Sequence, residues 1–197
     1  MLLSQGAFGA LRLQNGASSA PDGIMPPMHW TDAIIESLRF HDVWLIPYVP
    51  DAIGWQVLSK LEQDPFFHTV PVAREEEAIA VASGAYAAGK RSAVFVQSSG
   101  FGNTINSLAQ LAQAHKIPVP VFVGMRGGLS EFNPVQIPSA HPIPGFLDAM
   151  NIPHYAPLIE ADVTPYVDGA LELSFASRLP VVVLLYSQLV GAKRATS

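Results

Sequence analysis

Short apolar runs of strand length alternate with helical patterns along most of this chain, and this alternation is what most limits the folds open to it. Five such runs are evident: residues 43–49, 69–72, 93–97, 119–124 and 181–185. The runs at 119–124 and 181–185 are apolar almost throughout, which is typical of strands buried on both faces of a sheet. Because helical patterns lie between the runs, we expect the connections to be of the βαβ type.

Capping and turn residues mark where the helices should begin. We expect Thr31 to cap a helix that carries Ile34 and Leu38, and Thr164 to cap the last long helix, which Pro165 opens and which runs to about residue 177. Further helices are expected at about residues 54–62, 75–88, 104–115 and 144–150. Right-handed crossovers place helices on both faces of a parallel sheet. We therefore predict a three-layer α/β sandwich with a parallel sheet of roughly six strands, which allows for one strand beyond the five evident runs.

Two segments have no clear periodicity. Residues 1–28 are interrupted by glycine, serine and proline, so we predict a flexible leader ahead of one domain at 29–197, with Met25 or Met28 as an alternative start. Residues 125–143 are broken by two glycines and three prolines. Long loops of this kind are often functional, so we expect this one to contribute to a site.

Composition and charge narrow the class of protein. Hydrophobic residues make up 49% of the chain and charged residues 14%. This composition is typical either of a protein whose surface is partly covered by partner subunits or of a well-packed single domain. The net charge of −5 comes without clusters of lysine and arginine, so we expect no nucleic-acid partner. The absence of cysteine removes disulfides and thiolate chemistry. Because no apolar run approaches the length of a membrane-spanning helix, the expected location is the cytoplasm.

In a parallel sheet, ligands bind beyond the carboxyl ends of the strands, so the turns at those ends are where a site should lie. One such turn, Gly100-Phe101-Gly102, is not a dinucleotide fingerprint because Ile105 occupies the third glycine position. It is either a tight strand-to-helix turn or a place where the backbone closely approaches a ligand. The six histidines lack the spacing of metal ligands, and we expect no metal site built from this chain alone.

Three consecutive glutamates, Glu75, Glu76 and Glu77, open the third predicted helix. The plain interpretation is that they complement the positive end of the helix dipole. Successive helical residues point about 100° apart, so at most one of the three side chains can face the cleft at the strand ends. Glu75 is the best placed of the three.

Several of these features together carry a resemblance to a known family. Residues 74–80, 84–86 and 97–106 resemble the pyrimidine-binding domain of phosphonopyruvate and sulfopyruvate decarboxylases, which are thiamine diphosphate enzymes. The stretches 126–128 and 131–134 look most like the alpha subunit of sulfopyruvate decarboxylase. The resemblance covers roughly residues 31–190.

The resemblance implies a role for particular residues. It implies that Glu75 hydrogen-bonds the aminopyrimidine ring of the cofactor and favours its imino form, which then acts as the internal base. It also places Asp51 and Gln97 near the reacting carbon, as residues that position substrate or relay a proton. Gly100, Phe101, Gly102 and Asn103 match the cofactor-binding turn. Ser98 and Arg126 are candidates for contacts with the substrate, with Arg126 facing its anionic end.

The resemblance also implies a partner. Single-chain relatives carry a second domain whose Gly-Asp-Gly motif holds Mg²⁺ and the diphosphate, and that motif does not occur in this sequence. We therefore expect a beta subunit that supplies both groups, in a hetero-oligomer such as a heterotetramer. The expected reaction converts a 3-substituted pyruvate such as sulfopyruvate to an aldehyde and CO2. Two alternatives stay open: a decarboxylase or carboligase for another 2-oxo acid, and a flavodoxin-like binding module without catalysis.

Overall fold

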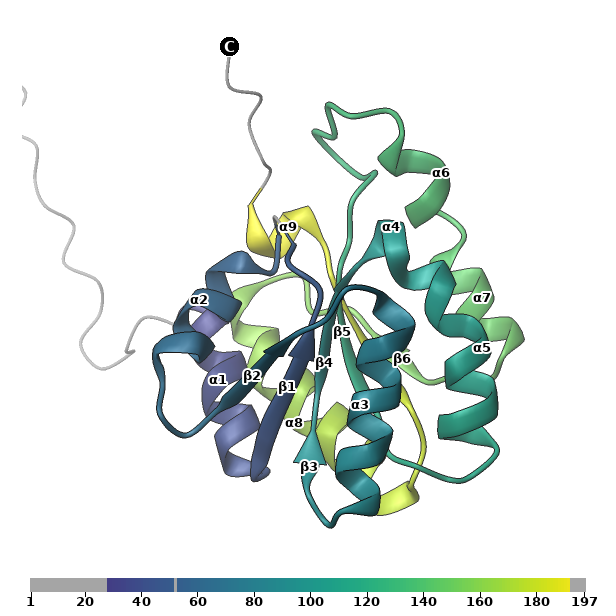
Figure 1. Ribbon diagram of the computed structural model, residues 1–197. Helices are drawn as coiled ribbons and strands as arrows, with labels where there is room; N and C mark the ends of the chain where they lie inside the picture. Colours follow the sequence, from purple (N-terminus) through teal and green to yellow (C-terminus); the bar gives the residue numbers. More distant parts are fainter. Residues whose placement is uncertain (1–27, 52, 192–197) are drawn as a thin grey trace, which may run out of the picture.

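The computed structural model describes residues 28–51 and 53–191 of the chain (Figure 1). Most of the predicted leader, and with it the alternative start at Met25, lies outside these residues. The strands are all parallel and form one sheet: β1 (Val43–Tyr48), β2 (His68–Pro71), β3 (Arg91–Ser92), β4 (Val94–Gln97), β5 (Pro120–Gly124), β6 (His154–Tyr155) and β7 (Val181–Leu185). Their order is β2-β1-β4-β5-β7-β6, with β3 paired to β1.

The predicted fold class is confirmed. Only Ala93 separates β3 from β4, and both pair with β1, so the seven strands occupy six positions across the sheet. The position that the apolar runs did not reveal is β6, which has two residues and lies at the edge beside β7. A strand this short leaves almost no pattern in a sequence.

Two helical layers cover the sheet (Figure 1). On one face, α1 (Trp30–Phe40), α2 (Trp55–Gln63) and α8 (Glu160–Ser177) share a buried core with residues such as Phe95 and Phe122. These two rings stack across β4 and β5 with centroids 4.6 Å apart. On the other face, α3 (Glu75–Ala87), α7 (Ile143–Ala149) and the helical segment after β4 pack against Val94, Val96 and Val121. Side chains of successive strand residues thus alternate between two cores.

The helical segment after β4 begins earlier than predicted. It runs through α4 (Ser98–Phe101), a 3₁₀ turn (Gly102–Thr104), α5 (Ile105–Ser107) and a π-helical stretch (Leu108–Gln113), whereas the sequence indicated a start at Thr104. Phe101, Thr104, Leu108 and Ala112 are all buried. Their spacing of three or four residues carries the helix through the glycines that seemed to delay it.

Both predicted helix caps were wrong. Helix α1 is capped by His29, whose Nδ1 accepts the backbone N–H of Thr31 at 3.4 Å, so Thr31 already lies inside the helix. Helix α8 begins at Glu160, and Pro165 lies within it. The helix tolerates Pro165 because the carbonyl that loses its hydrogen bond belongs to Ala161, which is exposed in the first turn. Glu160 and Asp162 in that turn favour the earlier start.

The long segment after β5 is partly helical. It contains α6 (Gln136–Ala140), which the prolines and glycines of residues 125–143 hid from the sequence pattern. In the described part of the chain, none of the helices combines the length and apolar character that crossing a membrane requires.

Candidate active site

The turns that follow β1, β2, β4, β5 and β7 meet at the carboxyl edge of the sheet, because all strands run in the same direction. Glu75 stands at this edge as the first residue of α3, directly after the turn that follows β2. Its carboxylate lies over Gly100 in α4: a Cβ on Gly100 would be 1.8 Å from Glu75 Oε1. Asn103 donates from Nδ2 to Glu75 Oε2 at 3.2 Å. The glycine turn therefore provides the space that the Glu75 carboxylate occupies.

The three neighbouring glutamates have different surroundings. Glu76 pairs with Arg74, with Glu76 Oε1 2.5 Å from Arg74 Nε. The pKa of Glu76 is lowered, first by a hydrogen bond from its own backbone N–H and then by Arg74. Glu77 accepts the backbone N–H of Ala73 at 3.0 Å and so satisfies a donor at the start of α3. Among the three, Glu75 is the one that reaches the turn after β4.

Asp51 follows β1 and organises the turn into α2. Its Oδ1 accepts the backbone N–H of Ile53 at 3.0 Å, and its Oδ2 accepts that of Gly54 at 2.9 Å. The side chain also lies against the end of β5, where a Cβ on Gly124 would be 2.3 Å from Asp51 Oδ2. Gly124 therefore leaves the space that the Asp51 carboxylate needs at the carboxyl edge.

Gln97 and Ser98 lie at the end of β4. Gln97 donates from Nε2 to Ser99 Oγ at 2.5 Å and is half-buried. Ser98 is fully buried, and its Oγ accepts the backbone N–H of Arg126 at 3.0 Å. This hydroxyl therefore connects the turn after β4 to the loop after β5. Ser98, which was predicted to contact substrate, has a structural role in this hydrogen bond.

The predicted cofactor turn splits into buried and exposed parts. Phe101 is fully buried in the core beneath α3, so its part at the site is limited to its backbone. Gly102 and Asn103 are exposed. Together with Glu75, they form a surface at the carboxyl edge that a flat ring could approach.

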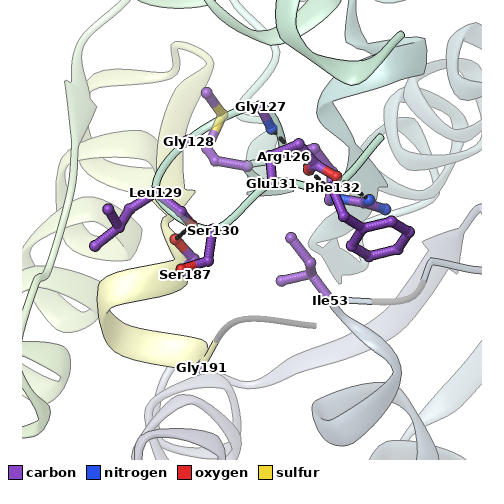
Figure 2. A pocket seen from close by; sticks show the side chains of 11 residues that line it. Ile53, Arg126, Gly127, Gly128, Leu129, Ser130, Glu131, Phe132, Ser187 and Gly191 are labelled. Carbon is purple, nitrogen blue, oxygen red and sulfur yellow. Dashed lines mark hydrogen bonds and ion pairs between the residues drawn. The ribbon is translucent and has the colours of Figure 1, made fainter. Parts of the chain in front are cut away.

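A pocket of about 300 Å³, including space open to solvent, lies beside the ends of β5 and β7 (Figure 2). Ile53, the loop from Met125 to Phe132, Ser187 and Gly191 line it. Arg126 enters a bidentate ion pair with Glu131, from Nε at 2.8 Å and from Nη2 at 2.7 Å. The guanidinium lowers the pKa of Glu131 to about 2. The pKa of Arg126 is raised in turn, mainly by its hydrogen bond to Glu131 and to a smaller extent by the charge of Asp51.

Sequence reasoning missed three residues at this edge. Ser187 follows β7 and donates from Oγ to the carbonyl of Leu129 at 3.2 Å. Its position directly after an apolar strand was the available signal. Gly124 ends β5, and a glycine inside a strand pattern indicates a close approach by another group. Glu131 belongs to a stretch that supports the resemblance, but its pairing with Arg126 becomes visible only in the folded loop.

Glu75 and the glycine turn both lie in a segment that is similar to a known protein family. Residues 28–128 match the family described as thiamine pyrophosphate enzyme, N-terminal TPP binding domain. The chain belongs to this family. Thiamine pyrophosphate is another name for thiamine diphosphate, so the predicted recognition is confirmed. The match includes Glu75 and the glycine turn and ends within the loop after β5.

Individual relatives agree with the family. The chain is 34% identical over 158 residues to the sulfopyruvate decarboxylase subunit alpha of Methanococcus maripaludis, covering 80% of this chain and 95% of that one. It is 35% identical to the subunit of the same name from Methanocaldococcus jannaschii, covering 77% and 90%. A solved 2-oxoglutarate:ferredoxin oxidoreductase from Magnetococcus marinus superposes with a TM-score of 0.64. At 17% identity, with 83% of this chain and 29% of that one covered, it supports the fold alone.

The residues present suit part of the cofactor. A carboxylate held over a glycine by an asparagine amide fits an aminopyrimidine ring, which offers hydrogen-bonding nitrogens at the edge of a flat surface. Among residues 28–51 and 53–191, no group of three or more His, Cys, Asp or Glu side chains is arranged to hold a metal ion.

Proposed function

We propose that this chain is the alpha subunit of a two-chain thiamine diphosphate-dependent decarboxylase whose substrate is a 3-substituted pyruvate such as sulfopyruvate. The class, a carboxy-lyase that uses thiamine diphosphate, follows from the family and from the named alpha subunits that match most of this chain. The observation that carries the proposal in the structure is the Glu75 carboxylate over Gly100.

Glu75 acts on the cofactor in this account. Its carboxylate hydrogen-bonds a ring nitrogen of the aminopyrimidine and shares a proton there, while the Asn103 amide holds the other carboxylate oxygen. When bound, thiamine diphosphate would supply the nucleophile and the electron sink that decarboxylation of a 2-oxo acid requires. The chain therefore needs no nucleophile of its own, in keeping with the absence of cysteine.

The other candidate residues position groups around Glu75. Gly100 leaves room for the Glu75 carboxylate, Gly102 is exposed beside Asn103, and Phe101 fixes this turn from the core. Gln97 and Asp51, at the ends of two adjacent strands, border the side where the reacting carbon would lie. Ser98 aligns the loop that begins at Arg126. Each of these roles is tested by variants in the assembled enzyme.

A beta subunit completes the enzyme in this proposal. The name alpha given to both relatives supports a second chain. In this proposal that second chain holds Mg²⁺ and the diphosphate. The complex is a hetero-oligomer such as a heterotetramer. We keep a cytoplasmic location as a prediction that cell fractionation tests.

The test is reconstitution. The chain encoded beside this one would be co-purified with it, and CO2 release would be followed with thiamine diphosphate, Mg²⁺ and sulfopyruvate, phosphonopyruvate or pyruvate. We expect activity from the complex only, with the highest kcat/KM for a 3-substituted pyruvate. Activity confined to 2-oxo acids that carry no second anionic group, or carboligation without decarboxylation, would favour the alternative enzyme classes. A complex that binds the cofactor but does no chemistry would favour a binding module.

A further inference from the structure

The loop after β5 is held by a buried ion pair. The side chains of Arg126 and Glu131 are 8% and 6% exposed. Besides the two bonds from the Arg126 guanidinium, Glu131 accepts the backbone N–H groups of Gly127 and Asn133, each at 3.0 Å. One carboxylate thus receives four hydrogen bonds from within eight residues. We call this arrangement, made by Arg126 and Glu131, the loop clamp.

The clamped loop is also fixed to its surroundings. Ser98 accepts the N–H of Arg126 at one end, and Ser187 donates to Leu129 in the middle. Gly127 has φ +76°, and a Cβ there would be 2.9 Å from the carbonyl oxygen of Gln136 at the start of α6. Figure 2 shows the loop around the pocket, with Arg126 and Glu131 joined on one side. The loop is therefore a preformed wall of the pocket.

This arrangement bears on how substrate charge is recognised. A residue that receives an anion needs positive charge that is not already neutralised, and a bidentate carboxylate is the strongest competitor a protein offers to a guanidinium. Glu131 holds Arg126 in this way at the position where the anionic end of a substrate was expected. The Glu131 carboxylate that holds Arg126 is itself fixed by hydrogen bonds from the backbone N–H groups of Gly127 and Asn133.

We infer that Arg126 is a positioning residue, which together with Glu131 fixes residues 126–133 as a wall of the substrate pocket, and that it is not the receptor for the anionic end of the substrate. The inference rests on the proposed function, since it concerns a substrate with a second anionic group. Recognition of that group then falls to other donors of the assembled enzyme. The clamp itself can be tested without any substrate.

Trypsin tests the clamp directly, because the bond from Arg126 to Gly127 is a tryptic site within the loop. In the parent complex this bond should resist cleavage, since a protease needs the segment to open locally. We expect Glu131→Gln to speed the appearance of a fragment beginning at Gly127 by at least about 10-fold. Glu76→Gln, which releases Arg74 from an exposed ion pair, should leave the rate unchanged. Equal rates of cleavage after Arg126 in Glu131→Gln and in the parent would contradict the inference that the clamp holds this loop.

Kinetics of the reconstituted complex separate the two roles of Arg126. If Arg126 positions the loop, Glu131→Gln and Arg126→Lys should both raise KM for sulfopyruvate by a similar factor, about 5-fold or more, because lysine cannot make the bidentate contact. The double variant should then be no worse than either single one, since both break the same unit. If Arg126 receives the anion, Glu131→Gln frees the guanidinium, so KM should fall or stay constant while Arg126→Lys raises it. That pattern would overturn the inference. A complex inactive on every 2-oxo acid would refute the proposed function instead, and the trypsin result would still decide the clamp.

Discussion

At the scale of single residues, the site depends on two glycines, which leave room for carboxylates because they have no side chain. Gly100 and Gly124 each leave the volume that a carboxylate occupies, Glu75 in one case and Asp51 in the other. In both pairs, the glycine and the carboxylate lie at the ends of different strands. The contacts therefore join turns that are distant in sequence, and they hold two acidic groups at the carboxyl edge.

Gly100→Ala should separate catalysis from stability. The added Cβ would fall 1.8 Å from Glu75 Oε1 and displace the carboxylate, while alanine favours the helix over glycine by up to about 1 kcal/mol. We expect the free energy of unfolding to be unchanged or higher and turnover of the complex to fall at least about 10²-fold. Gly169→Ala in α8, where a Cβ meets nothing within 4 Å, is the matched control. Parental turnover in Gly100→Ala would contradict this use of Glu75.

Glu131 should make stability depend on pH in the acid range. Arg126 holds the pKa of Glu131 at about 2, below its ordinary value of 4.5. The folded protein therefore binds this proton less readily than the unfolded chain, and the stabilisation is complete above about pH 4.5 and lost as the pH falls towards 2. At neutral pH, we expect the free energy of unfolding of the parent to be about 1–3 kcal/mol higher than that of Glu131→Gln. In urea titrations this difference should shrink below pH 4.5, and a difference that grows on acidification would contradict the assignment.

At the scale of elements, strands were easier to predict than helix ends. The apolar runs located β1, β4, β5 and β7 because these strands are largely buried by the helical layers, and burial leaves a pattern in the sequence. The run for β2 was also found, although its residues are half-buried or exposed. Helix starts depended on competing signals: Thr31 and Pro165 are good starting residues, yet both lie inside helices. Helix α4 was missed because it contains Gly100, which leaves room for the Glu75 carboxylate and weakens the helical pattern.

For the site too, some features leave a pattern in the sequence and others depend on the folded structure. The turns after the strands could be located because a parallel sheet brings its carboxyl ends to one edge, and the three glutamates could be ranked by helical geometry. Pairings across the fold, such as Arg126 with Glu131 or Ser187 with Leu129, depend on loop conformation. No periodicity in the sequence encodes those contacts.

The turn from β1 to α2 offers a test at this scale. Both carboxylate oxygens of Asp51 accept backbone N–H groups, so the side chain acts as a cap for the turn. We expect Asp51→Ala to lower the free energy of unfolding by about 1–2 kcal/mol, and Asp51→Asn, whose amide oxygen still accepts, to lower it by about half as much or less. Chemical denaturation measures both changes. An alanine variant as stable as the parent would show that the turn does not need this cap.

At the scale of the whole molecule, the candidate site lies at a surface that also exposes apolar side chains. Glu75 is half-buried and Asn103 is exposed at the carboxyl edge, and Leu129 and Phe132 lie exposed on the adjacent loop. Apolar side chains beside functional groups are typical of surfaces that a partner covers. The cofactor would then lie between two chains, with the pyrimidine on this one.

The chain alone should therefore bind thiamine diphosphate weakly. We expect isothermal titration calorimetry to show no tight, Mg²⁺-dependent binding to the purified chain, because the proposed ligands of the diphosphate and metal belong to the partner. The reconstituted complex is the positive control. Tight binding to this chain by itself would contradict the split between subunits.

The role of Glu75 can be measured at the cofactor itself. In the reconstituted complex, NMR can follow deuterium exchange at the C2–H of thiamine diphosphate, which reports cofactor activation without any substrate. Glu75→Gln should slow this exchange by at least about 10²-fold, while Glu76→Gln and Glu77→Gln should leave it near the parental rate. Those two glutamates contact Arg74 and the Ala73 backbone instead. Exchange as fast in Glu75→Gln as in the parent would contradict the account at its centre.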